Sequence, residues 1–187
     1  MKRFAAITLA LIMALICVPV TAEKADREIE GNLAVFTTAE DFAAGTLENV
    51  VTDESIGNGA IVLKEGESEG TYTSEVLGTA PFEYMVASWG ADTPKGTWIE
   101  VSARAYVDMK KGWTEWLSWG KWSDSVKRGS VSGECDLAYM DTDTFTISGK
   151  DGETASKIQL KVTLHANADG VSPTVRQLGA TYQNTLE

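Results

Sequence analysis

The chain is organised around Thr97-Trp-Ile-Glu-Val-Ser-Ala-Arg-Ala-Tyr-Val107, where apolar and polar side chains alternate. The odd-numbered positions from Ile99 to Val107 are all apolar. The even-numbered positions carry Trp98, Glu100, Ser102, Arg104 and Tyr106. Because successive residues of a strand point to opposite faces, this period predicts a strand with one face in a hydrophobic core. The segment from Lys157 to His165 has the same period and predicts a second such strand.

Turn-forming residues separate these and the other strand signals. Glycine-bounded turns lie at 65–70 and 90–96, and Asp151-Gly152 predicts a tight hairpin turn. No segment sustains a helical period, since the helix start at Thr38 is limited to a turn or two by Gly45. The pattern predicts an all-β fold, an antiparallel β-sandwich of jelly-roll type with about nine strands.

The N-terminus has the three parts of a secretory signal. Lys2 and Arg3 precede an apolar run, and Val20-Thr-Ala22 forms a small-residue cleavage site. We therefore expect residues 1–22 to be a signal peptide, 23–32 a flexible N-terminal arm and 33–187 the β-sandwich domain. The protein is then expected to be secreted, with no membrane association after cleavage.

The charge balance limits the classes of partner. The chain has 16 Lys and Arg residues against 27 Asp and Glu, a net charge of −11. Nucleic acids and anionic membranes require clustered cations, so neither is an expected partner. After signal cleavage Cys135 is the remaining cysteine, which excludes an intramolecular disulfide. The core must therefore supply the stability.

The sequence contains no recognisable catalytic constellation. Cys135 and His165 invite comparison with a thiol-protease dyad, but no pattern places them together and no third orienting group is evident. One His and one Cys cannot supply a usual zinc site, and we expect no cofactor. Acidic residues around Asp141 and Asp143 leave a structural calcium ion open, although their spacing is not that of an EF-hand. The sequence therefore leaves catalysis open but favours a protein that is not an enzyme.

Four of the six tryptophans lie between Gly112 and Trp122. A five-residue loop after Val107 would place Trp113 opposite Val107, and a hairpin in that register sends Trp113, Leu117 and Trp119 into the core. A one-residue change of loop length would exchange the two faces. The outer face would carry the candidate ligand-binding residues Trp98, Arg104, Tyr106, Trp116 and Trp122.

That outer face has two interpretations. Flat aromatic rings flanked by polar side chains suit stacking against a sugar ring. Alternatively, a loop such as 123–134 covers the rings, or Arg104 simply caps Trp116 through a cation–π contact.

Several motifs together carry a resemblance to a known family. They are Phe36-Thr-Thr-Ala-Glu-Asp-Phe42, Gly70-Thr-Tyr-Thr-Ser74, Trp89-x-Ala-Asp-Thr-Pro94-x-Gly-Thr97, Trp113-x-Glu-Trp116-x-x-Trp119 and Ser172-Pro-Thr174. With these the chain resembles the N-terminal β-sandwich module of secreted bacterial double-glycine-leader-peptidase-like cysteine peptidases. The papain-like catalytic domain of those enzymes has no counterpart among the 187 residues, so no residue inherits a catalytic role.

Two functions follow as hypotheses. The first is a secreted, non-catalytic binding or accessory module for extracellular polysaccharide, peptidoglycan or protein. The second is an accessory domain of a cysteine peptidase whose catalytic part is encoded downstream or has been lost. The DNA beyond the codon for Glu187 distinguishes them.

Overall fold

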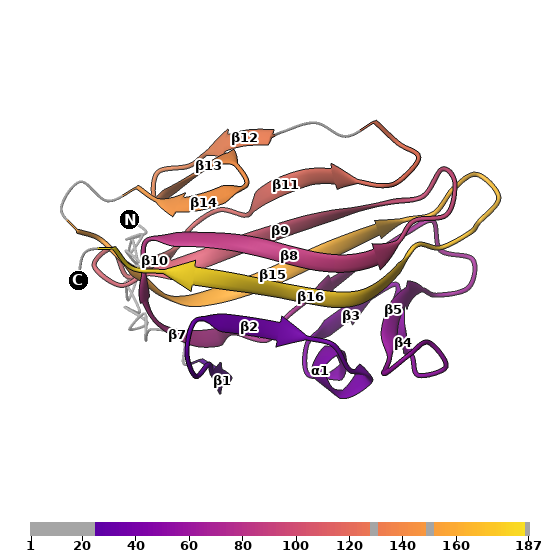
Figure 1. Cartoon of the computed structure of the whole chain (residues 1–187), viewed down its shortest axis with the longest axis horizontal. Coiled ribbons are helices and arrows are strands. Elements are labelled where there is room, and N and C mark those ends of the chain that lie inside the picture. The colour runs from indigo at the N-terminus through magenta and orange to yellow at the C-terminus, as the bar shows by residue number, and fades with distance from the viewer. Residues whose placement is uncertain (1–24, 128–130, 149–151, 186–187) are drawn as a thin grey trace, which may run out of the picture.

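The computed structural model describes residues 25–127, 131–148 and 152–185. The expected signal peptide lies outside these residues. The described residues form two eight-stranded sheets packed face to face, with one short helix among them, α1 (Ala39–Ala43), at one side (Figure 1). No helix in the described part of the chain combines the length and the apolar character needed to cross a membrane.

The first sheet, sheet A, is built around the long strands β9 and β15, which pair antiparallel along their whole length. Strands β10 and β11 flank β9, while β6 and β7 flank β15. The strands of sheet A are β1 (Arg27–Glu28), β3 (Thr46–Glu48), β6 (Glu69–Thr73), β7 (Leu77–Phe82), β9 (Trp98–Val107), β10 (Gly112–Trp113), β11 (Leu117–Trp122) and β15 (Ala155–His165).

The second sheet, sheet B, is built around β8 and β16, which cross the front of the molecule in Figure 1. Its order is β12-β13-β14-β8-β16-β5-β4, and β2 pairs with β16 beside β5. The strands of sheet B are β2 (Leu33–Phe36), β4 (Val50–Asp53), β5 (Ala60–Leu63), β8 (Tyr84–Asp92), β12 (Val131–Glu134), β13 (Ala138–Thr142), β14 (Thr144–Ile147) and β16 (Thr174–Gln183).

The predicted all-β sandwich is confirmed, but the number of strands differs from the expected nine. The described residues form sixteen strands, because several continuous signals are divided by bulges and tight turns. For example, residues 138–147 turn at Asp143 after Thr142, whose φ of 58° reverses the chain. One pair, β1 with β7, is parallel; the other pairs are antiparallel.

The alternating segments place their apolar sides as predicted. Ile99, Val101, Ala103, Ala105 and Val107 of β9 are fully buried. The apolar positions of β15 from Ile158 to Leu164 are buried in the same way. These residues meet the inner face of sheet B in one continuous core, so the sandwich interior fixes which face of β9 and β15 is left outside.

The N-terminal segment 25–32 does not behave as the arm that its irregular sequence suggested. Arg27 and Glu28 form β1 against β7, and Ile29 packs against the core. The Arg27 guanidinium lies 2.9 Å from Glu75 and 4.9 Å from the centre of the Phe36 ring. Contacts with residues remote in sequence therefore order a segment that has no periodicity of its own.

The hairpin after β9 departs from the expected register at both ends. Lys111 adopts a left-handed φ of 51°, so the loop closes one residue early and Trp113 pairs with Tyr106. The middle follows the prediction, with Leu117 opposite Ala103. A second shift between Ser118 and Lys121 then places Trp122 opposite Ile99. Each one-residue shift exchanges the faces of the residues beyond it.

Candidate functional site

The outer face of β9 and β15 gathers aromatic rings and cations, and we call it the cation–aromatic face. Antiparallel pairing sets Trp98 opposite His165 and Arg104 opposite Gln159. The strands β10 and β11 add further rings and a lysine along the other side of β9. The face comprises Trp98, Arg104, Tyr106, Trp113, Trp116, Lys121, Lys157, Gln159, Lys161 and His165.

One end of the face is built around Trp98. The imidazole of His165 lies on the indole of Trp98, with ring centroids 3.3 Å apart and planes 11° from parallel. Lys121 Nζ is 4.1 Å from the centroid of the same indole. His165 Nδ1 is 3.2 Å from a carboxylate oxygen of Glu69. Burial nevertheless lowers the pKa of His165, against the nearby carboxylates, so the neutral imidazole is favoured in this stack.

The centre of the face is built on Arg104. Its guanidinium carbon is 4.5 Å from the Trp113 ring centroid and 5.0 Å from that of Trp116. Its Nε and an Nη donate to Oε1 of Gln159 at 2.9 and 2.5 Å. Gln159 is itself fixed, because its amide donates to the carbonyl oxygen of Ser74 at 2.8 Å. The hydrogen bonds from Arg104 to Gln159 and from Gln159 to Ser74 therefore hold the guanidinium beside the two indoles.

Lysines of β15 lie on both sides of this centre. Lys161 Nζ is 4.4 Å from the Trp116 ring centroid, so that Trp116 contacts two cations. Lys157 Nζ is 4.2 Å from the ring centroid of Tyr106, a buried residue that meets Trp113 edge to face. Burial lowers the pKa of Lys161, partly offset by the carboxylate of Glu100.

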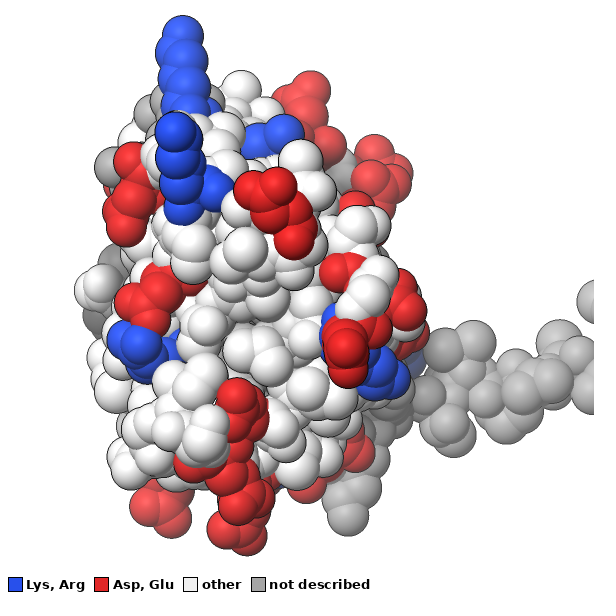
Figure 2. All heavy atoms as spheres, turned by 90° about the vertical axis from the view of Figure 1, so that its right-hand side faces the viewer, with Lys and Arg blue, Asp and Glu red and all other residues white. Residues whose placement is uncertain are grey.

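Glu100 is the acidic member of the β9 outer face. It accepts a hydrogen bond of 2.5 Å from the Ser118 hydroxyl and is the register partner of Lys121 and Thr163. Glu100 therefore lies near Lys121 and Lys161, at a distance along β9 from Arg104 and Lys157. Elsewhere, at the end of the sandwich shown in Figure 2, basic and acidic side chains are interspersed.

Four of the five residues predicted for an outer aromatic face lie there. Trp98, Arg104 and Tyr106 occupy the outer positions of β9, and Trp116 covers Arg104. The predicted outer position of Trp122 was wrong. The register shift near Gly120, which has a φ of +76°, turns Trp122 toward Ile99 and the core. Trp113 was assigned to the core but lies on the outer face beside Tyr106.

The remaining residues of the face were missed by sequence reasoning. Lys157, Gln159 and Lys161 were visible as the polar side of an alternating segment, but nothing in the sequence pairs that segment with β9.

The described part of the loop after Trp122 bonds to the turn at 93–97, where the Ser123 hydroxyl donates to the Thr97 carbonyl.

Cys135 and His165 do not form a dyad. Cys135 lies between β12 and β13 beside Trp113, near the Val107 end of β9. His165 pairs with Trp98 at the opposite end, about 30 Å away at the usual strand rise. In the regions that the structure describes, no group of three His, Cys, Asp or Glu side chains is arranged to hold a metal ion.

Comparison with known proteins places this architecture in a family. Residues 32–183 match the model of the Peptidase C39 N-terminal domain. The chain belongs to this family. The resemblance carried by the sequence motifs is therefore confirmed, over nearly all the sandwich.

Among solved structures, TmCBM61 in complex with β-1,4-galactotriose is similar to this peptidase C39 N-terminal domain, with 15% sequence identity and a TM-score of 0.43. The similarity covers 81% of this chain and 88% of that chain. No curated protein matches the sequence.

Proposed function

We propose that this peptidase C39 N-terminal domain is an exported, non-catalytic module that binds an extracellular or cell-wall glycan through the cation–aromatic face. The observation that carries the proposal is the concentration of Trp98, Trp113 and Trp116 on one side of sheet A. All three indoles remain partly accessible, whereas the core is filled by other residues. Partly exposed aromatics among fixed polar groups are typical of surfaces with a ligand.

The face is also rigid before any ligand arrives. Arg104, Gln159 and Ser74 form a continuous hydrogen-bond chain from the surface into the sheet. Arg104 and the three lysines of the face each lie within 5.0 Å of a ring centroid. A surface with few side chains left to order loses less conformational entropy on binding, which supports recognition of a weakly structured polymer.

Pull-down of the purified protein on insoluble peptidoglycan and insoluble polysaccharides tests this function. Trp116→Ala removes the ring that holds Arg104 and Lys161, and it should reduce the bound fraction severalfold. Tyr139→Ala is the matched control, since it removes an exposed ring from sheet B. Equal retention of both variants, or no retention of the unaltered protein on any of these polymers, would refute the proposal.

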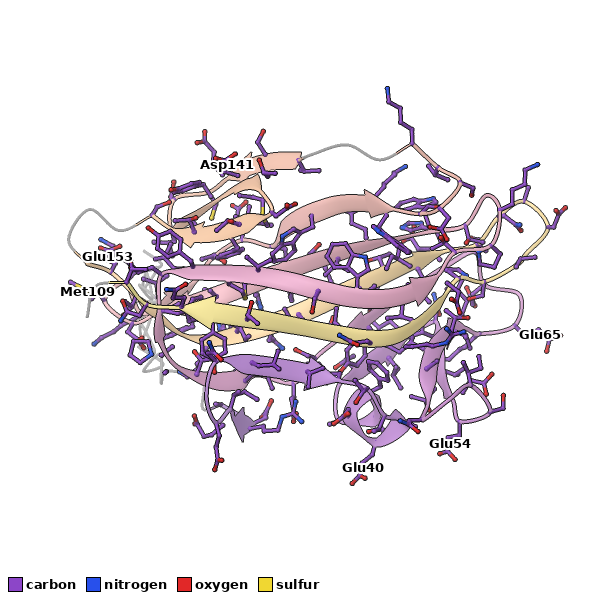
Figure 3. The ribbon with its side chains drawn as sticks, in the orientation of Figure 1. Glu40, Glu54, Glu65, Met109, Asp141 and Glu153 are labelled. Carbon is purple, nitrogen blue, oxygen red and sulfur yellow. The ribbon has the colours of Figure 1, made fainter. Side chains whose placement is uncertain are left out.

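A second candidate function is that of an accessory domain docked on a cysteine peptidase domain, favoured by the family match. Sheet B exposes apolar side chains on its outer face, where such a domain could dock, and its last strand, β16, ends beside them, where Gln183 pairs with Tyr84. Acidic side chains such as Glu40, Glu54 and Asp141 lie at the margins of the same view (Figure 3). The exposed apolar residues of this face are Leu33, Val35, Tyr84, Val86 and Tyr139.

Sequencing the DNA beyond the Glu187 codon tests this candidate. A continuing or adjacent frame with a papain-like Cys and His supports docking. In that case Val86→Lys should weaken association with the encoded domain, whereas Lys64→Gln should not. The absence of such a frame contradicts this second function.

A further inference from the structure

The lysines of the cation–aromatic face contrast with the charge of the whole protein. The chain has eleven more acidic than basic side chains. Arg27, Lys110 and Arg176, for example, form salt bridges within the described regions. In the same regions, the ammonium groups of Lys121, Lys157 and Lys161 have no salt bridge; their contacts are with aromatic rings.

A ring holds a cation without neutralising it. The π face attracts an ammonium or guanidinium group through its quadrupole and carries no net charge. The positive charge of Lys157 and Lys161 therefore remains available to a ligand. Three carboxylates lie along this side of sheet A: Glu100 beside Lys121, Glu69 beside His165, and Glu28 over Gly78, the register partner of Lys157. The four cations of the face exceed these three carboxylates by one, whereas the chain as a whole is strongly acidic.

The cations are arranged as a row. Lys157 and Lys161 are four residues apart on the outer side of β15, or about 13 Å at the usual rise per residue. Arg104 lies between them on the neighbouring strand, opposite Gln159. A flexible polymer with regularly spaced negative groups can contact two or three of these cations at once, which a single small anion cannot do.

The rings themselves are poor stacking platforms. Trp116 has cations within 5.0 Å of its centroid from both Arg104 and Lys161, and Trp98 has His165 on one face and Lys121 close by. Binding of single-stranded nucleic acid relies on bases stacked on accessible aromatic faces. Because the rings of this face are already in contact with cations, they favour a partner that is recognised by its charge and backbone.

We infer that the cation–aromatic face recognises a polyanionic glycan, whose carboxylate or phosphate groups pair with Lys157, Lys161 and Arg104. This inference rests on the proposed glycan-binding function and specifies the class of glycan. The aromatic residues position the cations through cation–π contacts, so their contribution to binding is indirect.

Affinity measurements with chemically matched polymers test the inference. Polygalacturonate and its fully methyl-esterified form share one backbone and differ in charge, while poly(glycerol phosphate) distinguishes phosphate from carboxylate. We expect tight binding to at least one polyanion and none to the methyl ester. With about three cations neutralised, the affinity should fall roughly 20- to 40-fold between 50 and 200 mM salt.

Charge-removing variants locate the site. Lys157→Gln combined with Lys161→Gln should weaken polyanion binding at least tenfold at 50 mM salt. The melting temperature should fall by only a few degrees, because two cation–π contacts are lost. Lys64→Gln is the matched control, because Lys64 follows β5 in sheet B. An oligonucleotide serves as a further probe and should bind more weakly than the polyanionic glycan.

The outcomes separate this inference from the function on which it rests. Equal, salt-independent binding of polygalacturonate and its methyl ester would overturn the polyanion inference while leaving glycan binding intact. Retention by neither these polymers nor peptidoglycan would overturn both. Preference for the oligonucleotide, or unaltered binding by the double variant, would also overturn the inference.

Discussion

Replacing Trp119 with Ala should destabilise the protein far more than replacing Trp116, three residues earlier in the same tryptophan stretch. Trp119 is 8% exposed, packs at a tilt on Phe145 and donates from Nε1 to the Asp143 carbonyl at 2.9 Å. Trp-to-Ala changes in a core cost about 3–5 kcal/mol. The orphaned carbonyl keeps the cost of Trp119→Ala toward the upper part of that range.

Trp116→Ala loses mainly two cation–π contacts, to Arg104 and Lys161. At about 0.5–1 kcal/mol each, these sum to about 1–2 kcal/mol. The two variants should therefore differ by about 2–3 kcal/mol in the free energy of unfolding. For a domain of this size, the melting temperature of Trp119→Ala should fall on the order of 10 °C.

Urea unfolding followed by far-UV circular dichroism measures the difference without depending on tryptophan fluorescence. Trp119→Phe is an informative control, because it retains an aromatic ring against Phe145 but removes the donor to Asp143; it should lie between the two alanine variants. If Trp116→Ala and Trp119→Ala were equally destabilised, the assignment of Trp119 to the core and Trp116 to the outer surface would be refuted.

Three further effects on stability are expected. Gly59→Ala should cost at least about 2 kcal/mol more than Gly57→Ala in urea unfolding, because an added Cβ at Gly59 would lie 2.3 Å from the Ala39 nitrogen, whereas Gly57 has nothing within 4 Å. Thr38→Ala should cost about 1 kcal/mol, since Thr38 and Asp41 cap α1 reciprocally; Thr38→Ser should restore most of it, and a neutral Thr38→Ala would show that the helix needs no cap. Burial lowers the folded-state pKa of His165. Its stabilising effect is therefore fully present above the unfolded pKa of about 6.5 and is lost as the pH falls from there toward the lower folded-state pKa. The urea midpoint should thus decrease more between pH 7.5 and pH 5.5 for the unaltered protein than for His165→Gln, and equal decreases would contradict the shift.

Local pattern was enough to predict the sandwich and the two strands that carry the candidate site. The period of two in residues 97–107 and 157–165 specifies which side chains share a face, because strand geometry depends on neighbours in the sequence. The short helix at Thr38 and the family resemblance also follow from local motifs. The outer positions of Trp98, Arg104 and Tyr106 could be predicted for the same reason.

Pairing between distant segments and the exact register of the tryptophan hairpin were decided only in the tertiary structure. The sequence does not reveal that β15 lies beside β9, so the lysines that complete the face could not be assigned to it. A left-handed residue at Lys111 and the shift near Gly120 each displace the register by one residue. Because the side-chain period of a strand is two, these small backbone changes move Trp113 outward and Trp122 inward.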